Sequence, residues 1–404
     1  MTSRTPVPAA TPVPTYSDRL RSPSETVALM RPFMPRYGIT RLARQTGLDL
    51  LGIPCFAAIR PNARTLSVNM GKGVDDAAAM ASAVMEATEF AIAEAPEVEA
   101  IHATVGAIRQ AGREVFDVSP WLPQGHAIPD DLELSWLEGR DLFSGASVFA
   151  PRDALIIGGA ETLADISQST NGIASGNSLE EATFHALCEL VERDATTLWI
   201  FKSDAAAGAT RIEPSAFADP LVDDLARTVR DAGFNLTLFD QTTTIGLPVI
   251  FALLSPAGEA TTRYFDLAAG CGCHPVAARA AIRAITEAAQ TRVSNIAGAW
   301  DDFDPAEYHQ RLSTSLQSLL TLAGAEPRRP PAGLPMGTSL PALFAHAKGQ
   351  LVAAGITRIA AFPLGGDEAG IAVVRLLAHG LEDRSTNRHW RPGPRATGAM
   401  LGLW

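Results

Sequence analysis

The sequence predicts an α+β (α/β) protein with long helices packed on mixed sheets. Three stretches carry apolar residues at the spacing of a long helix, residues 75–96, 178–203 and 276–297. Short apolar segments bounded by Gly, Pro or Asn lie between them, as is typical of strands. Because each long helix lies next to predicted strands in the sequence, the α+β or α/β class follows.

The N-terminal half is predicted to place two strands before the first long helix. Residues 52–61 and 64–70 form the strands, with a turn at Pro61-Asn62 between them. The sequence GKG then leads into the helix, which Pro96 stops. The other predicted segments of this half are a short helix at 24–36, a polar, Pro-rich connection near 117–135 and short strands within 133–158.

The C-terminal half is predicted to alternate helices with strands around the other two long helices. A helix at 220–233 closes on Gly233, and 235–255 is interpreted as strand, turn and strand. Residues 326–337 are rich in proline and predict a linker or surface loop. The remaining predictions are a helix at 339–354, strands near 357–362 and 370–377, and a tail from 388 without regular structure.

Composition excludes several classes of protein. The 404 residues are 47% hydrophobic and carry a formal net charge of −11, which argues against binding of nucleic acid or of an anionic membrane. Four cysteines do not form a disulfide framework in so long a chain. The N-terminus lacks a secretion signal, and no apolar run is long enough for a membrane helix, so a cytoplasmic protein is expected. Residues 1–16, rich in Pro, Thr and Ala, are expected to be a disordered leader.

The helix predicted at 178–203 carries a stripe of acidic side chains. Residues four, eight and eleven positions apart share a helical face, so Glu181, His185, Glu189 and Glu192 lie on one side. Glu181 also fits a capping box with Ser178. From this helix alone, a solvent-exposed acidic face is the favoured interpretation of Glu189 and Glu192.

The other two long helices repeat the pattern. Ser82, Glu86 and Glu89 share one face of the first helix. The third helix aligns Arg283, Glu287, Gln290 and Arg292 along one side. The three helix-bearing segments could be distant copies of one unit, although their letters alone do not establish it.

Stripes that face one shared cleft would require a cation. Two carboxylates about 4 Å apart repel by roughly 4 kcal/mol at an effective dielectric constant near 20. They either take up protons or bind a cation, and Mg²⁺ usually arrives with substrate phosphates. Arg193, Arg283 and the backbone N–H groups of the NGIASGN sequence would then hold phosphate oxygens. The pattern therefore indicates magnesium-nucleotide binding without a Walker loop or a GxGxxG motif.

Four motifs, in the same order, resemble those of the YcaO family. STNGIASGNSLEEATFHALCELVERDA is similar to the family signature S-N-G-x-A-x-G, E-A and E-x-x-E-R. SAVMEATE resembles the S-x-x-x-E-x-x-E helix, and LFDQTTTIGLPVIFALL resembles the D-x-T-x-x-x-G-(I/L)-P-V strand pair. GCGCHPVAARAAIRAITEAAQTR is similar to the G-x-G-x-H and R-A-x-T-E-x-x-Q-x-R segment. The resemblance covers roughly residues 20–396 and implies one YcaO domain of several α/β subdomains over 17–396, with a tail at 397–404.

The resemblance implies a YcaO-type fold around a central ATP cleft and an ATP- and Mg²⁺-dependent enzyme that activates a peptide backbone amide. A nucleophile attacks the amide carbonyl, its oxygen takes the γ-phosphate, and phosphate leaves with that oxygen. The implied magnesium ligands are Glu86, Glu89, Glu189 and Glu192. The implied ATP-binding residues are Arg21, Ser82, Asn177, Glu181, Arg193, Arg283 and Glu287. No residue is assigned as catalytic.

The branch of the family decides the product. The segment YGITRLARQTGLDLLGIPCFAAIRPNARTLSVNMGKG resembles members that work beside a TfuA-like protein. The end RPGPRATGAMLGLW holds only part of the P-x-P-x-P tail of azoline-forming members. The resemblance therefore favours thioamide formation, with a TfuA-like partner, in a precursor peptide or protein. The alternatives are an azoline-forming cyclodehydratase and a non-catalytic nucleotide-binding accessory protein, and a homodimer is left open.

Three other features carry weaker interpretations. Cys271 and Cys273 share one strand face beside His274, but they lack the second cluster of a structural zinc site. His185 is expected to pair with the neighbouring glutamates. Lys72 fits a turn lysine and a phosphate- or peptide-binding lysine equally well.

Overall fold

Three antiparallel sheets organise the protein. In the computed structural model, which describes residues 18–159, 164–258, 263–298, 305–321 and 328–403, the named strands pair only with antiparallel neighbours. The smallest sheet has the order β1-β2-β3. Its strands are β1 (Arg41–Arg44), β2 (Cys55–Ile59) and β3 (Val68–Lys72).

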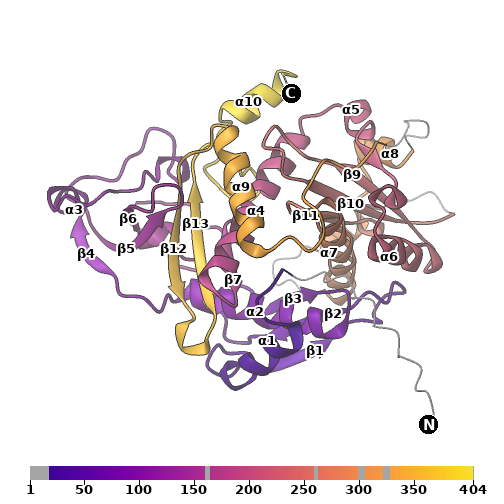
Figure 1. The fold of residues 1–404 in the computed structure, drawn as a ribbon, viewed down its shortest axis with the longest axis horizontal. Helices are drawn as coiled ribbons and strands as arrows, with labels where there is room; N and C mark the ends of the chain where they lie inside the picture. The colour runs from indigo at the N-terminus through magenta and orange to yellow at the C-terminus, as the bar shows by residue number, and fades with distance from the viewer. Residues whose placement is uncertain (1–17, 160–163, 259–262, 299–304, 322–327, 404) are drawn as a thin grey trace, which may run out of the picture.

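The other two sheets stand on either side of the centre of the molecule (Figure 1). One has the order β4-β5-β12-β13-β7, and β6 pairs with β5 outside this path. Its strands are β4 (Ile101–Thr104), β5 (Glu133–Asp141), β6 (Ser147–Pro151), β7 (Ile173–Gly176), β12 (Ile359–Gly365) and β13 (Ala372–Ala378). The other has the order β11-β10-β9-β8, with β8 (Arg211–Ile212), β9 (Phe234–Asp240), β10 (Val249–Pro256) and β11 (Ala268–Cys273).

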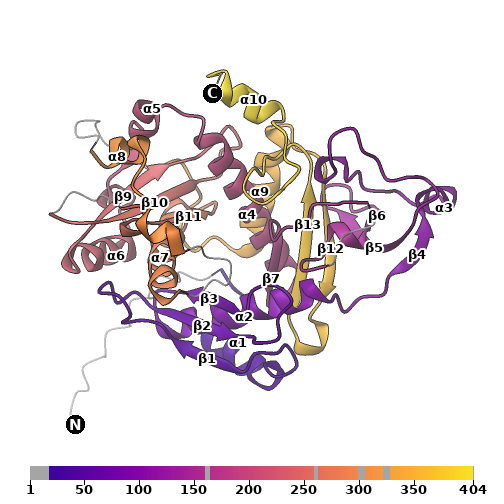
Figure 2. The ribbon, with the colours of Figure 1, turned by 180° about the vertical axis from the view of Figure 1, so that it is seen from behind.

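Three long helices connect these sheets. They are α2 (Asp76–Glu94), α4 (Leu179–Trp199) and α7 (Ala277–Ala297), and all three agree with the predicted helices within a few residues. The shorter helices are α1 (Pro23–Met30), α3 (Val105–Gln110), α5 (Asp204–Gly208), α6 (Pro220–Asp231), α8 (Thr314–Thr321), α9 (Leu340–Ala353) and α10 (Pro394–Met400). Seen from behind in Figure 2, α2 lies below the junction of the two larger sheets. The helices and sheets confirm the predicted α+β class.

Each long helix forms one unit with the strand just before it. The unit consists of a strand, a turn of a few residues and the helix: β3 with α2, β7 with α4, and β11 with α7. Each helix packs on its own strand and also contacts the strand of another unit, α2 on β7, α4 on β11 and α7 on β3. The three units therefore close into a ring, which supports the idea that they are copies of one motif.

Close packing inside a unit requires glycine in the strand. A Cβ atom at Gly71 of β3 would lie 2.1 Å from the backbone N of Ala83. A Cβ at Gly272 of β11 would lie 2.2 Å from the carbonyl oxygen of Ala280. Such distances are sterically impossible, so glycine faces alanine wherever the helix backbone approaches the strand.

The helix starts follow from local sequence. Asp75 caps α2 by accepting a hydrogen bond from the Ala78 N–H, and Ser178 caps α4 in the same way from Glu181 N–H. The predicted capping box is only half formed, because the Glu181 carboxylate binds the N-terminal segment instead. No side chain caps α7 at Val276.

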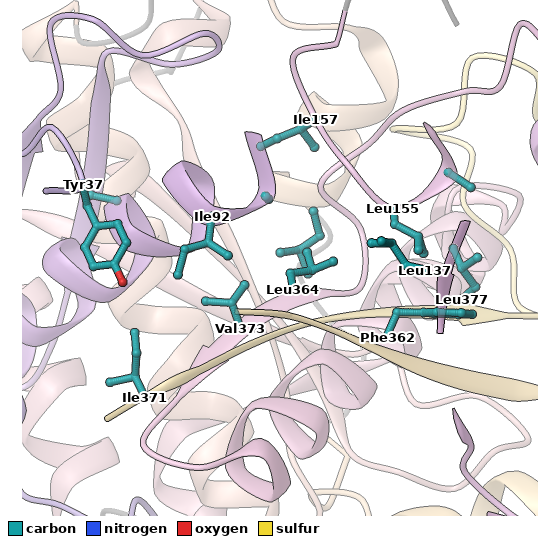
Figure 3. Packing of buried hydrophobic residues seen from close by; sticks show 14 of the residues in the cluster. Tyr37, Ile92, Leu137, Leu155, Ile157, Phe362, Leu364, Ile371, Val373 and Leu377 are labelled. Carbon is teal, nitrogen blue, oxygen red and sulfur yellow. The ribbon is translucent and has the colours of Figure 1, made fainter. Parts of the chain in front are cut away.

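Among the described residues, the largest apolar cluster lies between α2 and the sheet that has the order β4-β5-β12-β13-β7 (Figure 3). Ile92 of α2, Leu137 of β5, Phe362 and Leu364 of β12 and Val373 of β13 are buried in it. Burial of side chains of this size stabilises the fold by about 1.5–3 kcal/mol each. This cluster fixes α2, and with it the face of α2 that carries Glu86 and Glu89.

The C-terminal tail differs from the prediction. Helix α10 occupies part of the tail that was expected to lack regular structure. Its buried Arg395 forms an ion pair with Asp194 of α4, with 2.7 Å between Nη2 and Oδ2. The predicted leader 1–16 lies outside the described residues. No helix among the described residues combines the length and apolar character that spanning a bilayer requires.

Candidate active site

The ring of units brings five glutamates together. Glu86, Glu189 and Glu287 stand ten residues after the first residues of their helices, Asp76, Leu179 and Ala277. Glu89 and Glu192 stand one turn further along α2 and α4, where α7 has Gln290. We call Glu86, Glu89, Glu189, Glu192 and Glu287 the glutamate cluster. Their charges act on one another across the three helices, as the pKa changes below show.

Neighbouring units supply the hydrogen-bond donors of the cluster. Lys72 Nζ of β3 lies 2.7 Å from Glu287 Oε2. The backbone N–H of Cys273 in β11 donates to Glu192 Oε2 at 2.9 Å. The N–H of Gly172, just before β7, donates to Glu189 Oε1 at 3.2 Å. Glu89 lies beside Ser175 of β7. Each of the three strands thus contacts a carboxylate on the helix of another unit, and α4 also receives a donor from its own unit.

Burial and mutual repulsion raise the pKa of four of the five carboxyls. Burial raises the pKa of Glu86 to about 7 despite Lys72, and the charges of Glu287 and Glu189 add to the rise. Burial, then Glu287, raises the pKa of Glu192 to about 7. The pKa of Glu89 is raised well above its ordinary value by burial, Glu189 and Glu86, and burial also raises the pKa of Glu189. Only Glu287 has a lowered pKa, because Lys72, Arg193 and Arg283 outweigh its burial.

Two arginines predicted from the sequence lie at this cluster. Arg193 of α4 is next to Glu189, Glu192 and Glu287, whose charges raise its pKa against the effect of burial. Its buried Nε has no hydrogen-bond partner within the described part of the chain. Arg283 of α7 stands beside Glu192. A guanidinium that keeps an open donor next to several carboxylates is suited to hold an anionic oxygen.

His185 pairs with Arg283 and not with the glutamates, so its predicted partners were wrong. Arg283 Nη1 lies 3.1 Å from His185 Nδ1. Since a guanidinium can only donate, the Nδ1 atom accepts and the imidazole is neutral. Burial, together with the charges of Arg283 and Arg19, holds the pKa of His185 well below its usual range. The cause is the approach of α7 to α4, which helical spacing within α4 does not reveal.

A second polar group gathers at the start of α4. Asn177 Nδ2 donates to Glu181 Oε1 at 3.1 Å. Arg21 Nη1 lies 3.4 Å from Asn177 Oδ1 and 3.1 Å from the carbonyl oxygen of Gly370. The structure therefore brings together three of the predicted ATP-binding residues at the N-terminus of α4. Ser82 is half-buried on α2, one turn before Glu86.

Sequence reasoning missed the residues that connect the two groups. Arg19 Nη1 lies 3.0 Å from Glu181 Oε1, and the Leu20 N–H donates to Glu181 Oε2 at 2.9 Å. Asp18 pairs with His274 Nε2 at 2.9 Å and with Arg279 of α7. His274 and Arg279 both lie inside the 270–292 segment that resembles the family, but their partner Asp18 lies far away in the sequence. The acidic-basic order of residues 18–21 is the only sequence signal, and it is weak.

The residues present fit a magnesium-bound phosphate better than a protein-only metal site. Within the described residues, no three His, Cys, Asp or Glu side chains are arranged to hold a metal ion by themselves. Mg²⁺ in nucleotide sites usually takes one or two carboxylates and completes its shell with phosphates and water. Carboxyls with raised pKa values and an arginine with an open donor match that requirement.

Two cavities lie away from the glutamate cluster. One, of about 290 Å³, is lined by residues that include Tyr37, Arg60 and Glu97. The other, of about 640 Å³, is lined by Phe217, Val276 and Leu334 among others. Neither contains a predicted site residue. We therefore assign the site to the glutamate cluster, on the basis of its charged side chains and not of a cavity.

Comparison with known proteins identifies relatives over most of the chain. Residues 70–382 match the family model of the YcaO cyclodehydratases, which is described as ATP- and Mg²⁺-binding. The protein of the tfuA 3′ region of Rhizobium leguminosarum bv. trifolii is 38% identical over 400 residues, with coverage of 96% of this chain and 94% of the relative. A protein of Methanothermobacter thermautotrophicus is 34% identical over 300 residues, covering 72% and 74% of the two chains.

Solved structures share the fold. The YcaO protein of Methanopyrus kandleri bound with AMPPCP and Mg²⁺ superimposes with a TM-score of 0.68 at 21% identity, covering 90% of this chain and 92% of the other. A heterocyclase in complex with substrate and cofactor gives a TM-score of 0.70 at 18% identity, covering 97% of this chain and 56% of the other. At these identities the likeness concerns the fold, which is the one predicted.

Proposed function

This chain belongs to the YcaO family, and we propose that it uses ATP and Mg²⁺ to activate a backbone amide of a peptide or protein. The observation that carries the proposal is the convergence of five glutamates, Arg193 and Arg283 from three separate helices. Four of these carboxyls have raised pKa values, so a bound cation would stabilise their ionised forms. The family description as ATP- and Mg²⁺-binding agrees with this chemistry.

We assign different tasks to the two groups of residues. Glu86, Glu89, Glu189 and Glu192 are the proposed magnesium ligands. Glu287 is proposed to lie beside the bound metal, and Arg193 and Arg283 are proposed to hold phosphate oxygens. Asn177, Glu181, Arg21 and Ser82 are proposed to hold the rest of the nucleotide. Bound MgATP supplies the phosphoryl group that turns the amide oxygen into a leaving group. The residues of this chain orient that group and offset its charge.

We further propose that the product is a thioamide and that a TfuA-like protein takes part. The support is the 38% identical relative encoded in the tfuA 3′ region. In this reaction an external sulfur nucleophile adds to the amide carbon, and the oxygen leaves as phosphate. In the alternative, a Cys, Ser or Thr side chain of the substrate attacks instead, and an azoline forms.

The test is substrate-dependent phosphate release. The protein is incubated with ATP, Mg²⁺, a candidate precursor peptide, a sulfide source and a TfuA-like protein, and both phosphate and peptide mass are followed. Exchange of oxygen for sulfur raises the peptide mass, whereas azoline formation removes one water. Nucleotide binding without any substrate-dependent release would favour the accessory-protein alternative and contradict the proposed enzyme.

A further inference from the structure

Lys72 is a charged residue at the glutamate cluster to which the proposed function gives no task. It ends β3, and its Nζ contacts Glu287 Oε2 of α7 at 2.7 Å. The charges of Glu86 and Arg283 also act on it. The Lys72 and Glu287 side chains are 27% and 33% exposed, so solvent reaches this ion pair even though many protein atoms surround it.

The equivalent strand residues of the other units offer no charge. Cys273 of β11 provides only its backbone N–H, to Glu192. Ser175 of β7 lies beside Glu89 and provides neutral hydrogen-bonding groups. Each of the three strands thus meets a carboxylate of another unit, but only β3 does so with a cation. Since neutral groups suffice at two of these contacts, holding the helix in place does not explain the charge of Lys72.

The charge balance of the cluster explains why a lysine stands at this position. Five carboxylates face four cations within the described residues, namely Lys72, Arg193, Arg283 and Arg375, so the cluster keeps an excess of negative charge. Arg193 and Arg283 are held on helices that form the ring, whereas Lys72 has a flexible four-carbon stem and a compact charge that can change partner. A divalent cation that binds next to Glu287 meets repulsion from an ammonium group only a few ångströms away.

We propose that Lys72 is a resident counter-ion of the glutamate cluster, which Mg²⁺ displaces from Glu287 when the nucleotide binds. Without nucleotide, the Lys72 ammonium neutralises Glu287 and reduces the repulsion among the carboxylates. When MgATP arrives, the ammonium leaves Glu287 and pairs with phosphate oxygens. The inference rests on the proposed function, because it assumes that the cluster is the magnesium and phosphate site.

The proposal predicts opposite changes in two affinities. Lys72→Met removes the competing charge, so Mg²⁺ binding to the nucleotide-free protein becomes tighter by about tenfold or more. Binding of a non-hydrolysable ATP analogue with Mg²⁺ becomes weaker, because a phosphate contact is lost. Isothermal titration calorimetry measures both affinities. A residue with a merely structural role would weaken both when it is replaced.

Matched variants separate charge from fold. Lys202→Met removes the same charge from an exposed position away from the cluster and is expected to bind like the wild type. Lys72→Arg keeps the charge and should not tighten Mg²⁺ binding. Lys72→Gln serves if the methionine variant does not fold. In thermal melts without Mg²⁺, the neutral variants should be less stable than the wild type, and added Mg²⁺ should stabilise them more than it stabilises the wild type.

The outcomes are distinct. Unchanged or weaker Mg²⁺ binding in folded Lys72→Met and Lys72→Gln overturns the counter-ion role while the proposed function stands. Tighter Mg²⁺ binding together with unchanged analogue binding overturns the second half, the transfer of Lys72 to phosphate. A wild-type protein that binds neither Mg²⁺ nor the analogue overturns the proposed function itself.

Discussion

The α4 and α7 units place the same helical positions at the glutamate cluster but fill them differently. Counted from the first helical residue, α4 has His185, Glu189 and Glu192 where α7 has Arg283, Glu287 and Gln290. One stripe is therefore acidic with a neutral imidazole, and the other contains a cation, one carboxylate and an amide. At the first of these positions the two stripes touch, through His185 and Arg283.

The difference shows how a repeated unit can build an asymmetric site. The strand-turn-helix geometry fixes where three side chains of each helix lie. The residue types at these positions then decide which unit binds a cation and which binds phosphate. α2 resembles α4, since it also brings two glutamates. Two units thus supply carboxylate pairs suited to a cation, while α7 supplies one arginine suited to phosphate, Arg283, and α4 adds a second, Arg193. A strictly symmetric site would concentrate charge of one sign, so it would not bind both the cation and the anionic phosphate.

The largest expected effect comes from removing one carboxylate of the α4 stripe. Glu192→Gln or Glu189→Gln should reduce turnover by at least about a hundredfold, because each removes a proposed metal ligand. Phosphate release with substrate measures the effect, and circular dichroism checks the fold. Glu180→Gln, at an exposed position on the same helix, is the control and should retain activity. Near wild-type turnover in both cluster variants would contradict the assigned site.

The next effect tests whether the close packing of each unit matters. Gly272→Ala places a methyl group against the α7 backbone and should lower the free energy of unfolding by about 1–3 kcal/mol. Chemical denaturation measures it. Gly349→Ala, in α9, is the control, since nothing lies within 4 Å of its added Cβ. A stable Gly272→Ala variant would mean that β11 and α7 can separate without loss.

The pH dependence of stability and of Mg²⁺ affinity would distinguish the acidic stripes of α2 and α4 from the mixed stripe of α7. Glu86 and Glu192 have pKa values of about 7 in the fold, above their ordinary value of 4.5. The folded state therefore binds more protons between these values, so their contribution to stability is present below pH 4.5 and is lost as pH rises through 7. Mg²⁺ requires the deprotonated form, so its affinity should increase from about pH 5 to about pH 8.

The control for this pH dependence is the Glu86→Gln variant. It removes one of the titrating groups, so the change of melting temperature with pH in the absence of Mg²⁺ should become shallower than in the wild type. Calorimetric titration of Mg²⁺ at several pH values measures the affinity. An affinity that falls as pH rises would contradict the assignment of these carboxylates as ligands.

The smallest expected effect concerns the segment that joins α4 to α7. Asp18 pairs with Arg279 of α7, and Arg19 pairs with Glu181 of α4. Arg19→Met removes an ion pair whose arginine is 33% exposed, while the buried Glu181 keeps its hydrogen bonds from the Leu20 N–H and from Asn177, so nucleotide affinity should change only a few-fold. Fluorescence titration with a nucleotide analogue measures it, with the exposed Arg31→Met as control. A loss of binding as large as that of the cluster variants would place Arg19 among the nucleotide ligands.

Most long elements could be predicted because their signals are local. The three long helices and the strand pair β9-β10 follow from apolar spacing and from Gly and Pro at their ends. The strand β7 was not predicted, and β11 was anticipated only at Cys271 and Cys273, because their small residues, IASG and AAGCGC, lack the β-branched and aromatic character of ordinary strands. Those small residues are there because a helix backbone packs directly on the strand, which is a tertiary requirement.

Helical periodicity alone determined that glutamates would form a stripe on each long helix, since 3.6 residues per turn is a property of the local backbone. Only the tertiary structure decided that the stripes face one another, that Lys72 meets Glu287, and that His185 meets Arg283. These contacts join residues that are far apart in the sequence. They depend on how β3, β7 and β11 each meet the helix of another unit, and no local pattern encodes that choice.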